Sequence, residues 1–298
     1  MNYQPLTMSM PHNALVQVHL LVENTARGAG ILGEHGLAWS IESKGQHVLF
    51  DMGQGFTLEA NARKAGIDWA AANAVVFSHG HYDHVGGWCR WGSALTQAKV
   101  YLHPAALEPK YQMRADGRMM PSGDTQFAAT LTGSATEVIR ITQPTEVIPG
   151  IWTTGEVPRS TGYEDTGGDF YAGTQGSRND TIPDDLSLFF RTDSGLVVVL
   201  GCAHAGIINI LHHCIRLTGA RIHAVLGGMH LLHASTARMQ ATIEALREIG
   251  PDWLAPNHCT GDAAVAQLYA AFPDRVLELH AGQSLSFALN KNHAAGVL

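Results

Sequence analysis

Hydrophobic and polar positions along the chain predict alternating strands and helices. Alternating or continuous apolar runs predict strands at 14–22, 37–42, 47–50, 74–77, 99–102, 186–192, 196–200, 222–226 and 253–255, with shorter candidates at 137–142 and 151–154. Apolar positions at helical spacing predict helices at 56–65, 205–218, 234–249 and 262–271. Because strands and helices alternate in both halves, we expect an α/β protein of two layered sheets flanked by helices.

Turn residues support this division of the chain. The strands at 37–42 and 47–50 are separated by Ser43, Lys44 and Gly45. A second hairpin, with Gly195 in its turn, joins 186–192 to 196–200. Gly66 follows the helix at 56–65, where glycine is the preferred residue for ending a helix.

The segment 104–180 lacks such regularity. It is rich in Gly, Thr, Asp, Arg and Met, and its periodicity is weak. Long irregular segments in compact domains are usually either functional or disordered. We therefore expect a single domain over residues 1–298, with an elaboration over the active site at about 104–180. The alternative is a surface insertion without a role.

Composition narrows the class of protein. Apolar residues make up 45% of the 298 positions, which is enough for a large core, and charged residues make up only 15%. The formal net charge is −7, and no basic stripe is present, so a nucleic-acid partner is not expected. No apolar run is long enough to span a membrane. We expect the partner to be a small molecule; the sequence implies no oligomeric state.

The cysteines and the N-terminus indicate a cytoplasmic protein. None of the four cysteines, Cys89, Cys202, Cys214 and Cys259, forms a C-x-x-C pair, and four in a chain of this length do not form a disulfide framework. Residues 1–13 lack the basic and apolar regions of a signal peptide. A secreted protein is therefore not expected.

The strongest chemical signal is the run Ser78-His79-Gly80-His81-Tyr82-Asp83-His84. A strand end followed by a glycine-containing turn can direct His79 and His81 to one metal, with Asp83 and His84 on the far side for a second. Imidazole and carboxylate suit Zn²⁺, Fe or Mn²⁺. The alternative, a histidine-rich surface turn, is disfavoured because the apolar strand at 74–77 leads into the cluster from the core. We expect one or two divalent metal ions, zinc first, with iron or manganese as alternatives.

Most of the 17 histidines are not expected to bind metal. Those without a partner at ligand spacing, or within a predicted helix, are interpreted as structural or exposed. They are His12, His47, His103, His212, His213, His223, His280 and His293.

Together with further motifs, the histidine cluster resembles the metallo-β-lactamase superfamily. These motifs are Leu49-Phe50-Asp51-Met52-Gly53, Gly201-Cys202-Ala203-His204 and Pro256-Asn257-His258-Cys259-Thr260-Gly261. The resemblance covers residues 14–286 and implies a four-layer αββα sandwich. It also implies that Asp51 orients the metal loop. The implied ligands are His79, His81 and His204 for the first metal and Asp83, His84 and His258 for the second.

Several segments are similar to one branch, named for a dihydropterin ribofuranosylaminobenzene phosphate synthase. They are Gly33-Glu34-His35-Gly36-Leu37, Thr153-Thr154-Gly155-Glu156-Val157-Pro158-Arg159, Asp184-Asp185, Gly201 to Ile207, Gly227-Gly228-Met229-His230-Leu231 and His258-Cys259-Thr260-Gly261. This resemblance implies the fold and the metal site rather than the substrate.

The chain departs from the wider superfamily at one position. Most two-metal members carry a bridging aspartate at the end of the strand that corresponds to 222–226, and this chain has Gly227-Gly228 there. The second site should therefore bind its metal more weakly. His230 lies just beyond, and it could be a metal ligand, a substrate contact or a structural residue. A neutral imidazole cannot bridge two ions as a carboxylate can.

The resemblance implies a metal-dependent hydrolase that uses a metal-bound hydroxide on an ester, a phosphoester or a related small molecule, such as a pterin-type phosphate. Asp83 would orient the water and pass on its proton, and His230 is a second catalytic candidate. Expected substrate contacts, with a solvated surface role as the alternative, are Glu34, His35, Arg159 and Glu164. Arg159 would anchor an anionic group of the substrate.

Two other functions remain open. The missing bridging carboxylate allows a mononuclear iron thiol oxygenase on the same fold. A non-catalytic, metal-dependent ligand binder is the second alternative. Flavin-partnered diiron members usually carry Glu where this chain has His81, so that class is disfavoured.

Overall fold

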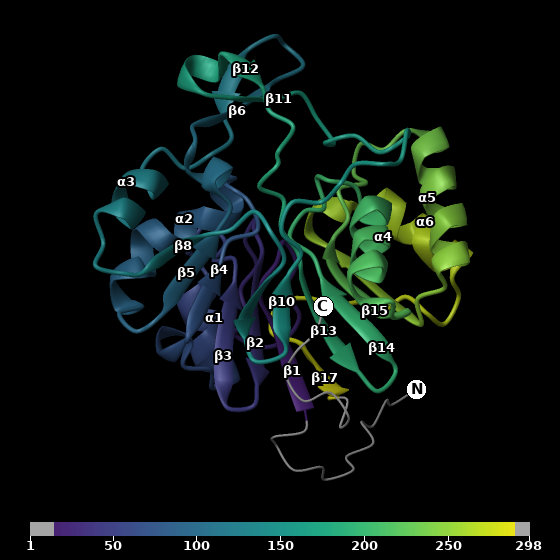
Figure 1. Ribbon diagram of the computed structural model, residues 1–298, viewed down its shortest axis with the longest axis horizontal. Coiled ribbons are helices and arrows are strands. Elements are labelled where there is room, and N and C mark those ends of the chain that lie inside the picture. Colours follow the sequence, from purple (N-terminus) through teal and green to yellow (C-terminus); the bar gives the residue numbers. More distant parts are fainter. Residues whose placement is uncertain (1–14, 290–298) are drawn as a thin grey trace.

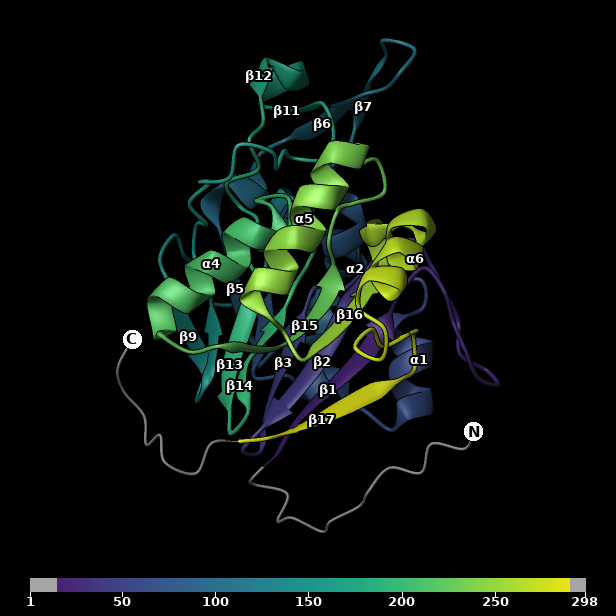
Figure 2. The same cartoon turned by 90° about the vertical axis from the view of Figure 1, so that its right-hand side faces the viewer.

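Two large sheets lie face to face in the computed structural model, which describes residues 15–289 (Figures 1 and 2). The N-terminal residues 1–13, which include His12, lie outside this range, and so does His293. The first sheet has the order β17-β1-β2-β3-β4-β5-β8. Its strands are β1 Leu15–Val22, β2 Ala38–Ser43, β3 Gln46–Phe50, β4 Ala74–Val76, β5 Lys99–Leu102, β8 Val138–Arg140 and β17 Ser284–Ala288.

The second sheet has the order β16-β15-β14-β13-β10-β9. Its strands are β9 Thr145–Ile148, β10 Ile151–Thr153, β13 Leu188–Thr192, β14 Gly195–Val199, β15 Ile222–Gly228 and β16 Trp253–Asn257. As the turn residues predict, β2 and β3 form an antiparallel hairpin around Lys44 and Gly45, and β13 pairs antiparallel with β14.

Helices cover the outer face of each sheet (Figure 1). Those beside the first sheet are α1 Leu58–Ala65, α2 Tyr82–Trp91 and α3 Phe127–Thr132. Those beside the second sheet are α4 Ile207–Thr218, α5 Thr236–Ile249 and α6 Asp262–Ala271. Short 3-10 helices are η2 Trp69–Ala71, η3 Gly92–Ala94, η4 Pro104–Leu107, η5 Thr174–Gly176 and η6 His258–Thr260. This arrangement is the four-layer αββα sandwich expected from the sequence.

The alternation of apolar side chains along the strands builds these layers. In β3, Val48 and Phe50 join the core between the two sheets, whereas Leu49 packs on the helix side of the first sheet. In β14, Val197 joins the inner core and Val198 packs toward α4, α5 and α6. Because successive side chains of a strand point to opposite faces, a strand buried on both sides is apolar throughout.

A small third sheet lies over one end of the sandwich (Figure 1). It has the order β12-β11-β6-β7. Its strands are β6 Lys110–Met113, β7 Met119–Pro121, β11 Phe170–Ala172 and β12 Arg178–Asn179. The expected elaboration at 104–180 is thus divided. It supplies this sheet and α3, but its middle part, β8, β9 and β10, belongs to the two large sheets.

Helix α2 is the main element that the hydrophobic pattern did not predict. Gly86 and Gly87 interrupt its apolar face. A Cβ atom at Gly87 would lie 2.3 Å from the Met52 carbonyl oxygen, so only glycine allows α2 to approach the loop after β3 this closely. The strand β17 and the short elements β6, β7, β9, β11, β12 and α3 were also not predicted. Among residues 15–289, no helix combines the length and apolar character that crossing a membrane requires.

Candidate metal centre

The proposed ligands come from strand ends that meet at one edge of the sandwich. β3 and β4 pair in parallel, and so do β14, β15 and β16. The carboxyl ends of parallel strands lie at the same edge of a sheet. Just beyond these ends, four residues other than glycine have a positive φ: Asp51 (61°), Ala203 (59°), His230 (45°) and His258 (48°). Such backbone costs about 1–3 kcal/mol per residue and tends to cluster at functional sites.

Three of the predicted ligands form what we call the histidine trio, His79, His81 and His204. One ring nitrogen from each lies within 4.8 Å of the other two. His79 Nε2 is 2.9 Å from His81 Nδ1. All three side chains are buried. Two of them come from the loop after β4 and the third from the loop after β14, so the trio joins the two large sheets.

Hydrogen bonds fix which ring nitrogens face this space. The Asp51 carboxylate accepts from the Ser78 amide and hydroxyl, each at 2.7 Å, and lies 2.7 Å from His84 Nδ1. The Ser78 hydroxyl is in turn 2.8 Å from His79 Nδ1. His204 Nδ1 lies 2.7 Å from the Thr166 carbonyl oxygen. With Nδ1 engaged in His79, His84 and His204, Nε2 is left as the ligand atom of each. His81 instead faces His79 through Nδ1.

The second group, which we call the carboxylate cluster, is centred on Asp83. Its Oδ2 atom lies 3.3 Å from His35 Nε2, 3.4 Å from His258 Nε2 and 3.7 Å from His84 Nε2. The structure thus brings Asp83, His84 and His258 together, as the second predicted ligand set requires. It adds His35, whose side chain is 56% exposed at the mouth of the site.

Burial and neighbouring charges set the ionisation of these groups. Burial holds the pKa of His79, His81 and His204 well below the usual value of a histidine. Neutral imidazole is the form that binds metal. Burial opposes ionisation of Asp83, but His84 and His258 hold the pKa of its carboxyl far below the ordinary range.

The residues fit divalent metal ions. The Nε2 atoms of His204 and His258 are buried and have no hydrogen-bond partner among the described residues. Leaving buried polar atoms unpaired costs free energy, and here the unpaired atoms are aromatic nitrogens that point into two neighbouring groups of ligands. Metal coordination would satisfy them.

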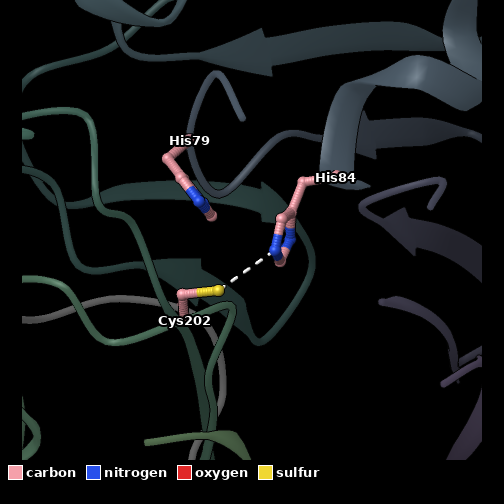
Figure 3. A group of neighbouring side chains, drawn as sticks. All are labelled: His79, His84 and Cys202. Carbon is pink, nitrogen blue, oxygen red and sulfur yellow. Dashed lines mark hydrogen bonds between the residues drawn. The ribbon is translucent and has the colours of Figure 1, made fainter. Parts of the chain in front are cut away.

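Two cysteines that sequence reasoning left out also lie in this centre. Cys202 Sγ is 3.1 Å from His84 Nε2, and Figure 3 shows it facing His84 beside His79. The Cys259 thiol donates to the Cys202 carbonyl oxygen at 3.5 Å. Burial raises the pKa of Cys202 well above its usual value; burial acts the same way on Cys259, but Cys202 and His258 hold the pKa of Cys259 below its usual value. The sequence did contain a signal for both cysteines. Cys202 lies two residues before the predicted ligand His204, and Cys259 directly follows the predicted ligand His258.

His230 lies beside the histidine trio without joining it. Its ring centroid is 4.2 Å from that of His204 and 6.4 Å from that of Phe170. A Cβ atom at Gly167 would lie 1.9 Å from His230 Nδ1, so the segment around Gly167 covers the ring closely. Burial, reinforced by Arg238 and His258, lowers the pKa of His230 to about 4. No ligand group among residues 15–289 with all ligand atoms within 4.8 Å includes it.

Three of the four expected substrate contacts are engaged elsewhere. The Glu34 carboxylate accepts from the backbone amides of Gln54, Gly55, Phe56 and Thr57, at 2.8–3.2 Å. A carboxylate offers about four acceptor positions, and these amides use all of them. The structure therefore assigns Glu34 to holding the loop before α1 rather than to a substrate.

Glu164 and Arg159 also hold backbone in place. Glu164 accepts from the amides of Ile208 and Asn209 in the first turn of α4, at 2.9 and 3.0 Å. Arg159 donates to the His204 carbonyl at 2.6 Å and to the carbonyls of Thr181 and Ile182. Both therefore stabilise the loop that carries His204, and His35 is the expected contact that lies at the site itself.

Arg238 is a further residue that sequence reasoning missed. It lies in the first turn of α5 and is only 3% exposed. Its Nη1 pairs with the Asp165 carboxylate, whose side chain is 70% exposed, while its Nε and Nη2 atoms have no partner within the described range. The signal was its spacing, because Arg238, Thr242 and Leu246 lie four residues apart on the buried face of the helix.

A buried ion triad of Lys110, Asp180 and Asp184 stabilises the loop that carries His79 and His81. Lys110 Nζ lies 2.8 Å from both Asp180 Oδ2 and Asp184 Oδ1, and Lys110 is fully buried. Asp184 Oδ2 accepts from the Gly80 amide, between the first two histidines, at 2.8 Å. The next residue, Asp185, accepts from the Ala205 amide beside the third histidine, at 2.7 Å.

We expect Lys110→Met to destabilise the fold by about 3–5 kcal/mol, because it leaves two buried carboxylates without their cation. Urea unfolding at equal metal loading measures the loss. Lys99→Met is the matched control: Lys99 pairs with Glu137 at 3.2 Å but is 53% exposed, so its loss should stay below about 1 kcal/mol. Equal losses in the two variants would contradict a structural role for the triad.

Comparison with known proteins agrees with this geometry. A family model described as the metallo-beta-lactamase superfamily matches residues 32–258. A 7,8-dihydropterin-6-methyl-4-(beta-D-ribofuranosyl)-aminobenzene-5'-phosphate synthase of Methanocaldococcus jannaschii is 25% identical over 284 residues, 91% of this chain and 97% of the relative. An uncharacterised protein of the same archaeon is 31% identical over 259 residues, 84% of this chain and 93% of its own.

Among solved structures, the chain is similar to Tm1679, described as a metal-dependent hydrolase of the beta-lactamase superfamily. The TM-score is 0.79 and the identity 32%, and the match covers 92% of this chain and 99% of the other. The relatives therefore cover most of the chain, and the range matched by the family model, 32–258, spans both groups of proposed ligands.

Proposed function

The chain belongs to the metallo-β-lactamase superfamily, and from that premise we propose that it is a metal-dependent hydrolase of small anionic esters or phosphoesters. The observation that carries the proposal is the histidine trio beside the carboxylate cluster. One ring nitrogen from each histidine of the trio faces one space, which suits ligand binding and has no evident structural purpose. We assign His79, His81 and His204 to a first metal, and Asp83, His84 and His258 to a second. Zinc is the first candidate for both.

The protein's side chains divide the work around these ions. A bound divalent ion supplies Lewis-acid polarisation and lowers the pKa of bound water to roughly 7. Asp83 is a carboxylate held ionised by its neighbours, so it can accept a hydrogen bond from the attacking water and take its proton. His35, exposed at the mouth beside Asp83, is placed to meet the incoming substrate.

Arg238 is our candidate for the group that binds the substrate's anion. A guanidinium with unpaired, buried N–H groups is costly unless a ligand completes its hydrogen bonds, and guanidinium suits phosphate or carboxylate. The curated relative is named as the synthase of a 5'-phosphate compound, which supports a phosphate-bearing substrate for this chain. Arg159, the sequence-based candidate, has most of its donors occupied by backbone carbonyls.

Elemental analysis and turnover together test the proposal. Protein purified without added metal should contain zinc, and it should hydrolyse generic phosphomonoesters, phosphodiesters or carboxylic esters. A chelator should abolish turnover and added metal should restore it. Iron alone, with oxygen consumption in the presence of small thiols, would instead indicate the oxygenase. Ligand binding without any turnover would indicate the non-catalytic binder.

Arg238→Ala tests the anionic substrate. We expect kcat/KM for a phosphomonoester to fall about 10- to 100-fold, the equivalent of a hydrogen bond to a charged group. Hydrolysis of an uncharged ester should be unchanged. Arg247→Ala, on the same helix, is the matched control because Arg247 stacks on Phe272, away from the site. An equal effect of Arg238→Ala on charged and uncharged substrates would rule out the anion contact.

A further inference from the structure

The metal centre contains two thiols in addition to its imidazoles and carboxylate. Cys202 follows the end of β14 and is 3% exposed, and Cys259 lies in η6 directly after His258. They come from segments 57 residues apart and meet only because β14, β15 and β16 are neighbours. Their sulfur atoms lie among the proposed ligands rather than in an apolar core.

Cys202 lies between the two proposed metal positions. Its Sγ forms one group, within 4.8 Å, with ring nitrogens of His79 and His84. It forms a second group of the same size with His258 and Cys259. His79 belongs to the histidine trio, and His258 to the carboxylate cluster. Sγ of Cys202 is therefore close to ligands of both ions.

The glycine pair at the end of β15 excludes a carboxylate from this space. A Cβ atom at Gly228 would lie 2.6 Å from Cys259 Sγ and 2.5 Å from the Gly201 carbonyl oxygen. At Gly227 it would lie 2.4 Å from the Leu200 carbonyl oxygen. Both glycines allow β15 to pack against β14, where the Gly228 amide donates to Gly201 at 3.0 Å. The aspartate expected at the end of β15 is thus absent. The sulfur atoms nearby come from Cys202, in the loop after β14, and from Cys259, in η6.

The charge balance of the metal centre also favours sulfur ligands. Among the six ligands assigned above, Asp83 is the single anion, which leaves two divalent ions poorly neutralised. Two thiolates would supply the missing negative charge. His258 Nε2, buried and without a hydrogen-bond partner in the described part of the chain, lies in the same group as both sulfurs.

We propose that Cys202 and Cys259 are thiolate ligands of the metal centre, with Cys202 shared between the two ions in place of a bridging carboxylate. This inference rests on the metal centre of the proposed function and deepens it. Soft sulfur ligands favour zinc or iron over manganese or magnesium. Because the bridging aspartate is missing, the second site is expected to bind its metal weakly. The two cysteines would complete it as a site with sulfur, nitrogen and oxygen ligands.

Cobalt(II) substitution tests the proposal because a cobalt–thiolate bond gives an intense near-ultraviolet charge-transfer band, which imidazole and carboxylate ligands do not. We expect the band in the cobalt-loaded wild-type protein, reduced intensity in Cys202→Ala and in Cys259→Ala, and no band in the double variant. Cys89→Ala and Cys214→Ala are matched controls. Cys89 lies beside Asp124 and Thr130, and Cys214 lies within α4 and is buried among apolar side chains, so both should leave the band intact.

Cobalt stoichiometry gives a second, independent readout. Cys202→Ala should lower it from about two ions per chain towards one, whereas Cys202→Asp should keep about two while weakening the band. Two bound ions with no charge-transfer band in the wild-type protein would overturn the thiolate assignment and leave the proposed metal centre intact. No bound cobalt at all would overturn the metal centre itself. Because each single variant removes one sulfur, the proposal can be tested even if the double variant does not fold.

Discussion

Replacing His81 with alanine is expected to remove most of the bound metal and all measurable activity. His81 is one of three buried imidazoles whose ring nitrogens converge within 4.8 Å. Its loss leaves two of the three imidazoles assigned to the first ion, whereas catalytic zinc sites usually keep three protein ligands and an open position. Stability should fall as well, because a ligand at about 100 times its Kd stabilises the folded state by about 2.7 kcal/mol.

Elemental analysis and thermal unfolding with and without a chelator measure both effects. The wild-type Tm should fall on chelation, and the Tm of His81→Ala should fall much less. His47→Ala is the matched control, since His47 lies 2.8 Å from the Ser40 hydroxyl on β2, away from the proposed ligands. Full metal content in His81→Ala would show that the trio has been wrongly assigned.

Replacing His230 with asparagine is expected to lower kcat by roughly 10²–10⁴-fold, the usual scale of general acid–base contributions, without changing metal content. The ring lies beside that of His204, tilted by 45°, but joins no group of convergent ligand atoms among residues 15–289. Asparagine is preferred to alanine because the φ of 45° at this residue is one that asparagine tolerates. A loss of kcat then reports the imidazole rather than the backbone.

Measuring metal content and kcat of the His230→Asn variant side by side distinguishes the possible roles of His230. A fall in metal stoichiometry would make it a ligand, and retention of both metal and kcat would make it structural. His223→Asn is the control for a distant histidine, since His223 pairs with Asp252 at 2.6 Å on the surface. It should change neither quantity.

Local patterns were sufficient for most strands of the two large sheets and for most of the α-helices. β5 and α6 have the predicted bounds, because apolar periodicity reports burial directly. The helix α2 was missed because its glycine pair breaks that periodicity, and the reason for the glycines is the loop around Met52, which is distant in sequence. A helix or strand is thus hard to predict from sequence where its residue types are determined by contacts with distant segments.

Charged residues beside the site illustrate a related difficulty. Glu34, Arg159 and Glu164 were expected to face a substrate, and all three instead bind backbone groups. These groups are amides of the loop before α1, the His204 carbonyl and amides in the first turn of α4. A carboxylate or guanidinium looks the same in sequence whether its partner is a substrate or a peptide group. Arg238 was overlooked for the opposite reason, since an arginine in a helix is usually exposed.

The sequence by itself determined the layered fold and the histidine cluster, because strand periodicity and the spacing of H-x-H-x-D-H are local properties of the chain. Only the tertiary structure decided which groups surround the ligands. Cys202, His230 and Cys259 follow three separate strands, and they come together because β14, β15 and β16 pair in parallel with their carboxyl ends at one edge. Such proximity depends on strand order and register, which hydrogen bonding between distant segments sets.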